Sequence, residues 1–162
     1  KIPYVMANLA YACITQELYD EAVEICLKAL NIHEHNPYAW ANLGCAFTHL
    51  HDYQKAYNAL NKALEIENSI LPALTTLCGV CLKLGKFDEG NMAAQSALQI
   101  NPQDADTMYN FAKCKYAQYK LVDASGLLRK AIGINPNDSK FLNLLGCIIA
   151  KEWRVPDYSW QR

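Results

Sequence analysis

A period of 34 residues runs through this chain and constrains its fold more than any other feature. The period is clearest in a repeated phrase of an alanine, an aliphatic residue, a variable residue and an isoleucine. The alanines that open the four copies are Ala29, Ala63, Ala97 and Ala131. Seven residues before each alanine stands a small residue, at Ala22, Ala56, Gly90 and Ala124. A fixed period over four copies indicates one supersecondary unit stacked on itself.

Each copy has the pattern of two amphipathic helices. In the second copy, the apolar residues follow the three-four-three spacing of a helix that buries one face; they are Trp40, Leu43, Gly44 and Phe47. A second stripe begins at a large apolar residue that also recurs every 34 residues, at Tyr19, Tyr53, Phe87 and Leu121. The sequence therefore predicts helices of about 12 to 14 residues, joined by short turns.

Asparagine–proline pairs are expected to mark helix starts. Asn36-Pro37 supplies a cap residue followed by proline at the first helical position. We expect Asn101-Pro102 and Asn135-Pro136 to punctuate the later copies at corresponding places.

The repeat resembles the tetratricopeptide repeat family. The residues that carry the resemblance are Trp40-x2-Leu43-Gly44-x2-Phe47, followed by Ala56, Leu60 and Ala63. The copies lie at 3–36, 37–70, 71–104 and 105–138, with one further first helix at 139–152. The resemblance implies an all-α fold, a right-handed α-solenoid of antiparallel helix pairs with about 4.5 repeats in one domain over 1–162.

The chain departs from the family pattern at a few positions. Leu77-Cys78 and Phe111-Ala112 stand where Leu-Gly is usual, and Lys115 replaces an aromatic residue next to Tyr116. The chain begins at Lys1 and stops soon after an unpaired first helix, so we interpret it as a fragment of a longer repeat protein.

Composition narrows the function classes. The net charge is −1 with no long basic run, so a nucleic-acid footprint is missing. The sequence contains no run of 18 apolar residues, so it predicts no membrane-spanning helix. We find no nucleophile elbow, phosphate-binding loop or paired carboxylates in a fixed local spacing, and predict no enzyme activity, cofactor or metal for the chain alone.

The seven cysteines all fall inside predicted helices, which favours a reducing compartment, cytoplasmic or nuclear. The motif Cys78-x-x-Cys81 has two interpretations, buried packing or a redox or zinc site, and its mid-helix position favours packing. His33-x-His35 and His49-x-His51 are interpreted as exposed turn residues, because the intervening helix separates the two pairs by roughly 20 Å.

A polar position recurs on the face that should be concave. Asn8, Asn42 and Asn110 share it, and Thr76 takes it in the third copy, each just before a residue predicted to be buried such as Leu9. One interpretation is an ordinary exposed position. The other is an asparagine ladder whose amides bond to the backbone of an extended peptide, as in the similar repeats of O-GlcNAc transferase.

Tyrosines and lysines share this face by helical phase. The tyrosines are Tyr4, Tyr11, Tyr38, Tyr109 and Tyr116, and the lysines are Lys83, Lys113, Lys140 and Lys151. With only Asp106 opposing the lysines, we predict a partner with acidic character toward the C-terminal half. The family's clamp for acidic C-termini is absent, because Ala7 and Tyr11 stand where its lysine and asparagine are needed.

The last residues, 153–162, leave the repeat pattern. They are expected to cap Leu145, Cys147, Ile148 and Ile149, with continuation into a longer chain or a self-bound peptide as alternatives.

The sequence thus predicts a protein–protein interaction scaffold that binds an extended peptide or a partner subunit in its concave groove. The alternatives are the substrate-recruiting arm of a larger enzyme, resembling that of O-GlcNAc transferase, and a secretion or assembly chaperone. Self-association through the solenoid ends is also open, because cut ends expose apolar helix faces.

Overall fold

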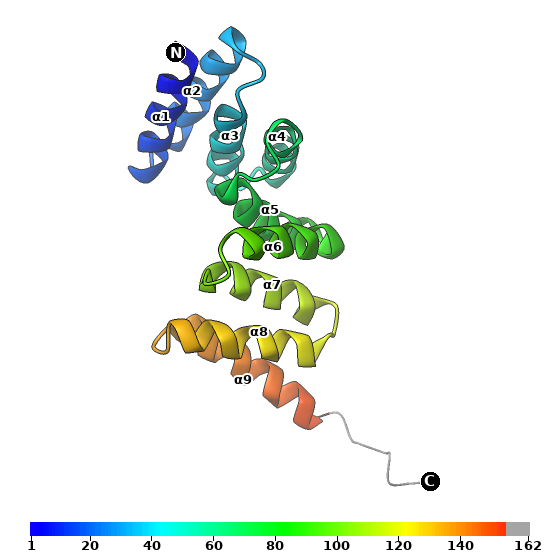
Figure 1. Ribbon diagram of the computed structural model, residues 1–162. Helices are drawn as coiled ribbons and strands as arrows, with labels where there is room; N and C mark the ends of the chain where they lie inside the picture. The colour runs from blue at the N-terminus through cyan, green and yellow to red at the C-terminus, as the bar shows by residue number, and fades with distance from the viewer. Residues whose placement is uncertain (155–162) are drawn as a thin grey trace.

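The computed structural model describes residues 1–154, which form nine α-helices stacked as antiparallel pairs (Figure 1). The helices are α1 (Ile2–Thr15), α2 (Tyr19–Ile32), α3 (Pro37–His49), α4 (Tyr53–Ile66), α5 (Leu71–Leu84), α6 (Phe87–Ile100), α7 (Ala105–Ala117), α8 (Leu121–Ile134) and α9 (Ser139–Arg154). This is the right-handed α-solenoid that the resemblance to the tetratricopeptide repeat family implies. No helix within this range is long and apolar enough to cross a membrane.

The first helices of the repeats, α1, α3, α5, α7 and α9, define one side of the solenoid. Neighbouring first helices from α1 to α7 contact one another directly, and each second helix packs on the first helix of the next repeat. Because the stack is tighter on the side of the first helices, it curves toward them, and they line the concave face.

The ladders of small residues lie where helices cross. Ala29, Ala63, Ala97 and Ala131 are fully buried. At Gly44 on α3, an added Cβ would lie 2.5 Å from Leu60 Cγ on α4, closer than side-chain packing permits. Small side chains are therefore what allows these helices to approach.

The asparagine–proline pairs turn out to have different roles. Asn36 caps α3 as predicted, since its Oδ1 accepts a hydrogen bond from Ala39 N at 3.2 Å, and its Nδ2 donates to Pro3 O at 3.1 Å. The prediction for the later pairs is wrong, because Asn101 and Asn135 are the C-caps of α6 and α8. Asp104 is the N-cap of α7, three residues later.

The turns within the repeats share a backbone conformation that the sequence did not reveal. The residues with positive φ are 34 apart, at Glu17, His51, Gly85 and Tyr119. Of these four residues only Gly85 is a glycine, which adopts a positive φ without steric cost. The tertiary stack therefore imposes one turn geometry on four different sequences.

Burial contradicts the sequence-based prediction at both ends of the stack. Leu9 was predicted to be buried, but it is 53% exposed because no helix within 1–154 packs on the outer side of α1. Ile148 was predicted to need a cap, but it is fully buried in a cluster with Leu128 and Phe141. The tail from residue 155, which was expected to form the cap, lies outside the described residues.

Candidate functional site

The concave face has a small, largely apolar pocket formed by α1, α3 and the start of α5. Its volume is about 200 Å³, and predicted groove residues from α1 and α3 meet in it. The lining residues are Asn8, Tyr11, Ile14, Tyr38, Ala41, Asn42, Cys45, Ile70 and Pro72. The helical phase of the repeat thus identified four side chains, two tyrosines and two asparagines, that converge in space.

The polar groups in this pocket are not equally available. Asn42 Nδ2 donates to Ala7 O on α1 at 2.7 Å, so this amide ties α3 to the preceding repeat. Asn8 is exposed. Tyr38 Oη lies 3.5 Å from Glu67 Oε1, and its ring centroid lies 6.4 Å from that of Tyr4. An amide has two N–H donors and a carbonyl acceptor, so Asn42 retains capacity for a ligand.

A second pocket continues the groove toward the C-terminus. It has a volume of about 660 Å³ and a polar lining of Cys45, Thr48, His49, Thr75, Thr76, Gly79, Asp104, Asp106, Thr107 and Asn110. Cys45 lines both pockets, so the two pockets adjoin on the concave face, the first against α1 and α3 and the second against α3, α5 and α7. Cys45 Sγ lies 3.4 Å from Thr76 Oγ1, and burial raises the pKa of this thiol.

The aromatic and basic residues predicted further along the face are in contact with each other. The Tyr109 ring centroid lies 5.0 Å from Lys113 Nζ and 5.7 Å from Lys140 Nζ. Lys140 Nζ also lies 2.6 Å from Asp106 Oδ1 and 3.4 Å from Asp138 Oδ2. The charge of Lys140 is therefore already compensated within the solenoid.

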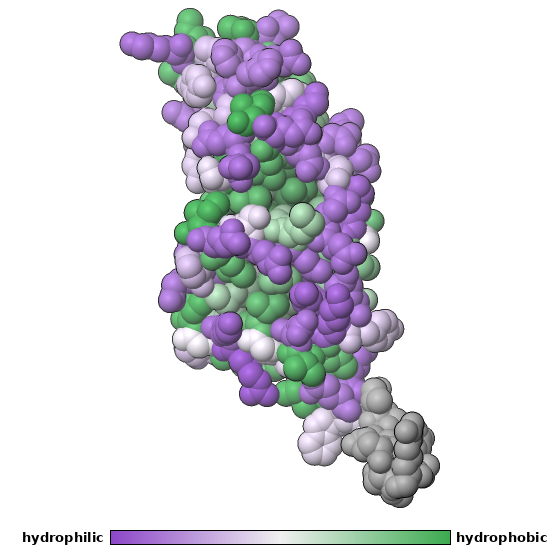
Figure 2. Space-filling model, turned by 45° about the vertical axis from the view of Figure 1, so that its right-hand side comes forward, coloured by the Kyte–Doolittle hydropathy of each residue, from purple (hydrophilic) through white to green (hydrophobic). Residues whose placement is uncertain are grey.

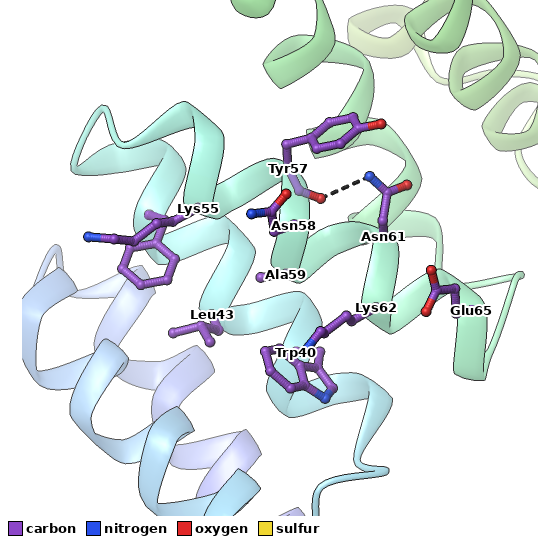
Figure 3. A pocket seen from close by; sticks show the side chains of 10 residues that line it. Trp40, Leu43, Lys55, Tyr57, Asn58, Ala59, Asn61, Lys62 and Glu65 are labelled. Carbon is purple, nitrogen blue, oxygen red and sulfur yellow. Dashed lines mark hydrogen bonds between the residues drawn. The ribbon is translucent and has the colours of Figure 1, made fainter.

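A crevice on the convex side was not identified from the sequence. It has a volume of about 700 Å³, and it is lined by Trp40, Leu43 and Phe47 of α3 and by residues of α4. Figure 3 shows Trp40 and Leu43 beside the side chains of α4. Lys62 Nζ lies 4.4 Å from the Trp40 ring centroid. The close-up shows the Lys62 side chain beside the Trp40 ring (Figure 3). The crevice opens because second helices diverge on the convex side, a property of the stack that one repeat does not reveal.

Apolar surface is visible outside the interior elsewhere as well. Figure 2 shows green apolar side chains in hollows along the length of the molecule, framed by purple polar ones.

The cysteine motif lies in the core rather than at a surface. Cys78 and Cys81 on α5 are fully buried together with Cys114 on α7. A Cβ added at Gly90 of α6 would lie 3.2 Å from Cys114 Sγ, so the glycine makes room for the thiol. Burial raises the pKa of the Cys81 thiol to about 11. Residues 1–154 contain no group of three His, Cys, Asp or Glu side chains placed to hold a metal ion.

All four histidines are exposed, as predicted from their positions near the turns. His49 stacks on Tyr19 with ring centroids 4.5 Å apart, and His51 Nδ1 lies 2.9 Å from Tyr53 Oη. The first contact connects the end of α3 to the start of α2, and the second connects the turn after α3 to the start of α4.

The geometry defines a helical-repeat solenoid with a continuous concave groove, and sequence comparison names its family. Models of the tetratricopeptide repeat match residues 3–36, 37–69 and 85–146. The chain belongs to the tetratricopeptide repeat family. The first helix of the third repeat falls outside these matches, where Leu77-Cys78 replaces the usual Leu-Gly.

Two curated relatives match parts of this chain. It is 45% identical over 56 residues to the TPR repeat-containing protein MJ1428 of Methanocaldococcus jannaschii, covering 35% of this chain and 10% of that protein. It is 24% identical over 136 residues to the BBSome complex member BBS4 homolog of Drosophila melanogaster, covering 83% of this chain and 28% of that protein. The chain thus spans less than a third of the length of either relative.

Solved structures share the fold at low sequence identity. MamA 41-end from Desulfovibrio magneticus RS-1 has a TM-score of 0.83 at 19% identity, covering 93% of this chain and 85% of the other. YrrB, described as a TPR protein with an unusual peptide-binding site, has a TM-score of 0.80 at 18% identity, covering 93% and 78%. The shared fold is the tetratricopeptide repeat solenoid.

Proposed function

We propose that the concave groove holds an extended segment of another protein. The observation that carries this proposal is the pocket in which Asn8, Tyr11, Tyr38 and Asn42 meet from two repeats. Tyrosine rings provide rigid apolar area with a polar tip, and side-chain amides both donate to and accept from a peptide backbone. This combination binds a chain through its backbone and one or two apolar side chains.

The proposal is tested by affinity purification from cell extract, followed by tiling the captured proteins as peptides. The groove variant is Tyr11→Ala with Tyr38→Ala. The matched control is Met92→Ala with Tyr119→Ala, which removes two exposed large side chains outside the groove lining. Asn42 is left unchanged, because its bond to Ala7 O also supports the fold.

We expect the groove variant to lose a partner that the control retains, with melting curves of both close to that of the unaltered chain. We also expect a peptide of that partner to bind alone. Equal retention by both variants would move the site away from the groove.

A second candidate function is that of a subunit in a larger assembly, with a folded partner rather than a peptide in the groove. The match to a BBSome complex member over 83% of this chain favours it. In that case the groove variant releases a partner, but no tiled peptide of that partner binds. An enzyme's recruiting arm or a chaperone would use the same groove, and the captured proteins distinguish those two contexts.

A further inference from the structure

The structure separates the four lysines predicted on the concave face into two kinds. Lys140 is paired with Asp106 and Asp138. Lys151 lies near the end of α9, with its Nζ 4.5 Å from the Tyr116 ring centroid. Lys83 and Lys113 have no ion-pair partner among residues 1–154. Three of the four lysines thus have no ion-pair partner in the described part of the chain, and Lys83 and Lys113 are the two of these that lie on α5 and α7.

The repeat geometry places Lys83 and Lys113 beside the larger groove pocket. Gly79 and Asn110 line that pocket, and a Cβ at Gly79 would lie 4.0 Å from Asn110 Nδ2 across the gap between α5 and α7. Lys83 follows Gly79 by four residues, and Lys113 follows Asn110 by three. Residues three or four apart share a helix face, so each lysine lies one turn further along from a pocket residue.

The charge of Lys83 acts on the ammonium group of Lys113. Lys113 is half-buried against the Tyr109 ring, whereas Lys83 is exposed. Burial, and after it the charge of Lys83, holds the pKa of Lys113 below its ordinary value of 10.5. The charged form of Lys113 is therefore disfavoured in the free protein by burial and by repulsion from Lys83. A bound anion would offset both effects, because it attracts both ammonium groups.

We propose that Lys83 and Lys113 form a carboxylate subsite of the groove, which selects extended partner segments carrying Asp or Glu at one position. The segment's backbone lies over Thr76 and Asn110, and its acidic side chain reaches the two lysines one turn beyond. This inference rests on the proposed groove function and adds the chemistry of the partner. Within residues 1–154, the lack of an ion-pair partner is what distinguishes this pair from Lys140.

The test is selection from a library of random decapeptides displayed on phage, each joined to the coat protein so that no peptide has a free C-terminus. Three forms of the chain are compared: unaltered, Lys83→Ser with Lys113→Ser, and Lys140→Ser with Lys151→Ser. Both variants lose two lysines, so they have the same net charge. Circular dichroism melts establish that all three are folded.

We expect Asp or Glu to be enriched at one fixed register on the unaltered chain and on the Lys140/Lys151 variant. On the Lys83/Lys113 variant we expect this enrichment to fall at least about tenfold, in keeping with the loss of a charge-assisted contact. If the enrichment of Asp or Glu falls equally in both variants, the acidic preference comes from net charge, and the proposed subsite is overturned. Binding that needs a free C-terminal carboxylate in synthetic peptides would overturn it as well.

The result also separates this inference from the groove function on which it rests. Peptides that bind the unaltered chain, lose binding with Tyr11→Ala and Tyr38→Ala, and show no acidic preference would refute the subsite alone. Failure of any peptide to be enriched on any form would refute the groove function together with it.

Discussion

The inner repeats and the two ends of the solenoid have the same sequence pattern but different environments. Leu43 and Leu9 occupy the same repeat position, yet Leu43 is 2% exposed against 53% for Leu9. Gly44 and Gly146 also share a position, and an added Cβ would clash at Gly44 but meet nothing within 4 Å at Gly146. In a stacked repeat, a residue's energetic role is set by whether a neighbour covers it.

The first and last helices, α1 and α9, each have apolar side chains that are exposed to solvent. On α1, exposed apolar side chains form a stripe of Ile2, Val5 and Leu9. On α9, Ile148 faces α8 and is buried, whereas Leu142 and Trp153 are exposed. Within residues 1–154, each end helix therefore resembles an inner helix that lacks one packing partner.

The largest difference in stability is expected between alanine substitutions of the two leucines. Leu43→Ala should lower the free energy of unfolding by about 3 kcal/mol, because it leaves a cavity in a cluster of buried side chains from α1, α2, α3 and α4. Leu9→Ala should cost less than about 1 kcal/mol, because about half of that side chain is already in water. Urea unfolding followed by circular dichroism measures both. Equal losses would show that Leu9 is covered in solution.

Replacing the two glycines by alanine should change the stability in opposite directions. Gly44→Ala should destabilise by about 1–3 kcal/mol, because the methyl group meets Leu60. Gly146→Ala has free space and should stabilise α9 by up to about 1 kcal/mol through helix propensity. The same unfolding assay applies. A stabilising Gly44→Ala variant would mean that α3 and α4 are further apart than described.

Because of its buried thiols, the stability of the fold should depend on pH in the alkaline range. Burial raises the pKa of Cys26 from 9.0 to about 12 and that of Cys81 to about 11. Above pH 9 these thiols ionise in the unfolded chain but stay protonated in the folded one, so stability should fall as the pH rises from 9 toward 11. Cys26→Ala with Cys81→Ala should flatten this fall, measured as the urea midpoint against pH.

The exposed Cys147 provides the control for the alkaline series. Cys147→Ala should leave the pH dependence unchanged while removing the thiol that reacts fastest with a chromogenic disulfide at pH 8. A slope that flattens equally in this control would assign the effect to other groups.

The smallest effect is expected at the lysines of the groove. The lowered pKa of Lys113 means that its charged form is disfavoured in the folded state. The resulting penalty is present at neutral pH and disappears as the pH rises through the lowered pKa to 10.5. Lys113→Met should therefore raise the melting temperature slightly at pH 7, and the gain should vanish near pH 11.

Lys151→Met at the exposed end should not raise the melting temperature, because a hydrogen bond with Tyr116 raises rather than lowers the pKa of Lys151. A Lys113→Met variant that melts below the unaltered chain would contradict the assignment of Lys113 as an uncompensated cation. A gain that persists at pH 11 would attribute it to the apolar methionine instead.

The sequence by itself determined the period, the helix pairs and the phase of each helix. Ala63 could be assigned to a helix crossing and Tyr11 to the concave face, because both follow from spacing along one chain segment. Helical periodicity is local, so it specifies the face on which a residue lies without reference to the rest of the fold.

Only the tertiary structure decided which members of each ladder are covered, paired or free. It exposed Leu9, gave Lys140 two carboxylates, tied Asn42 to Ala7 and opened the convex crevice beside Trp40. Each of these outcomes depends on a neighbouring helix, often a full repeat away in sequence. Burial and charge compensation are properties of the stack, because they depend on what occupies the space around a side chain rather than on the pattern that directs it there.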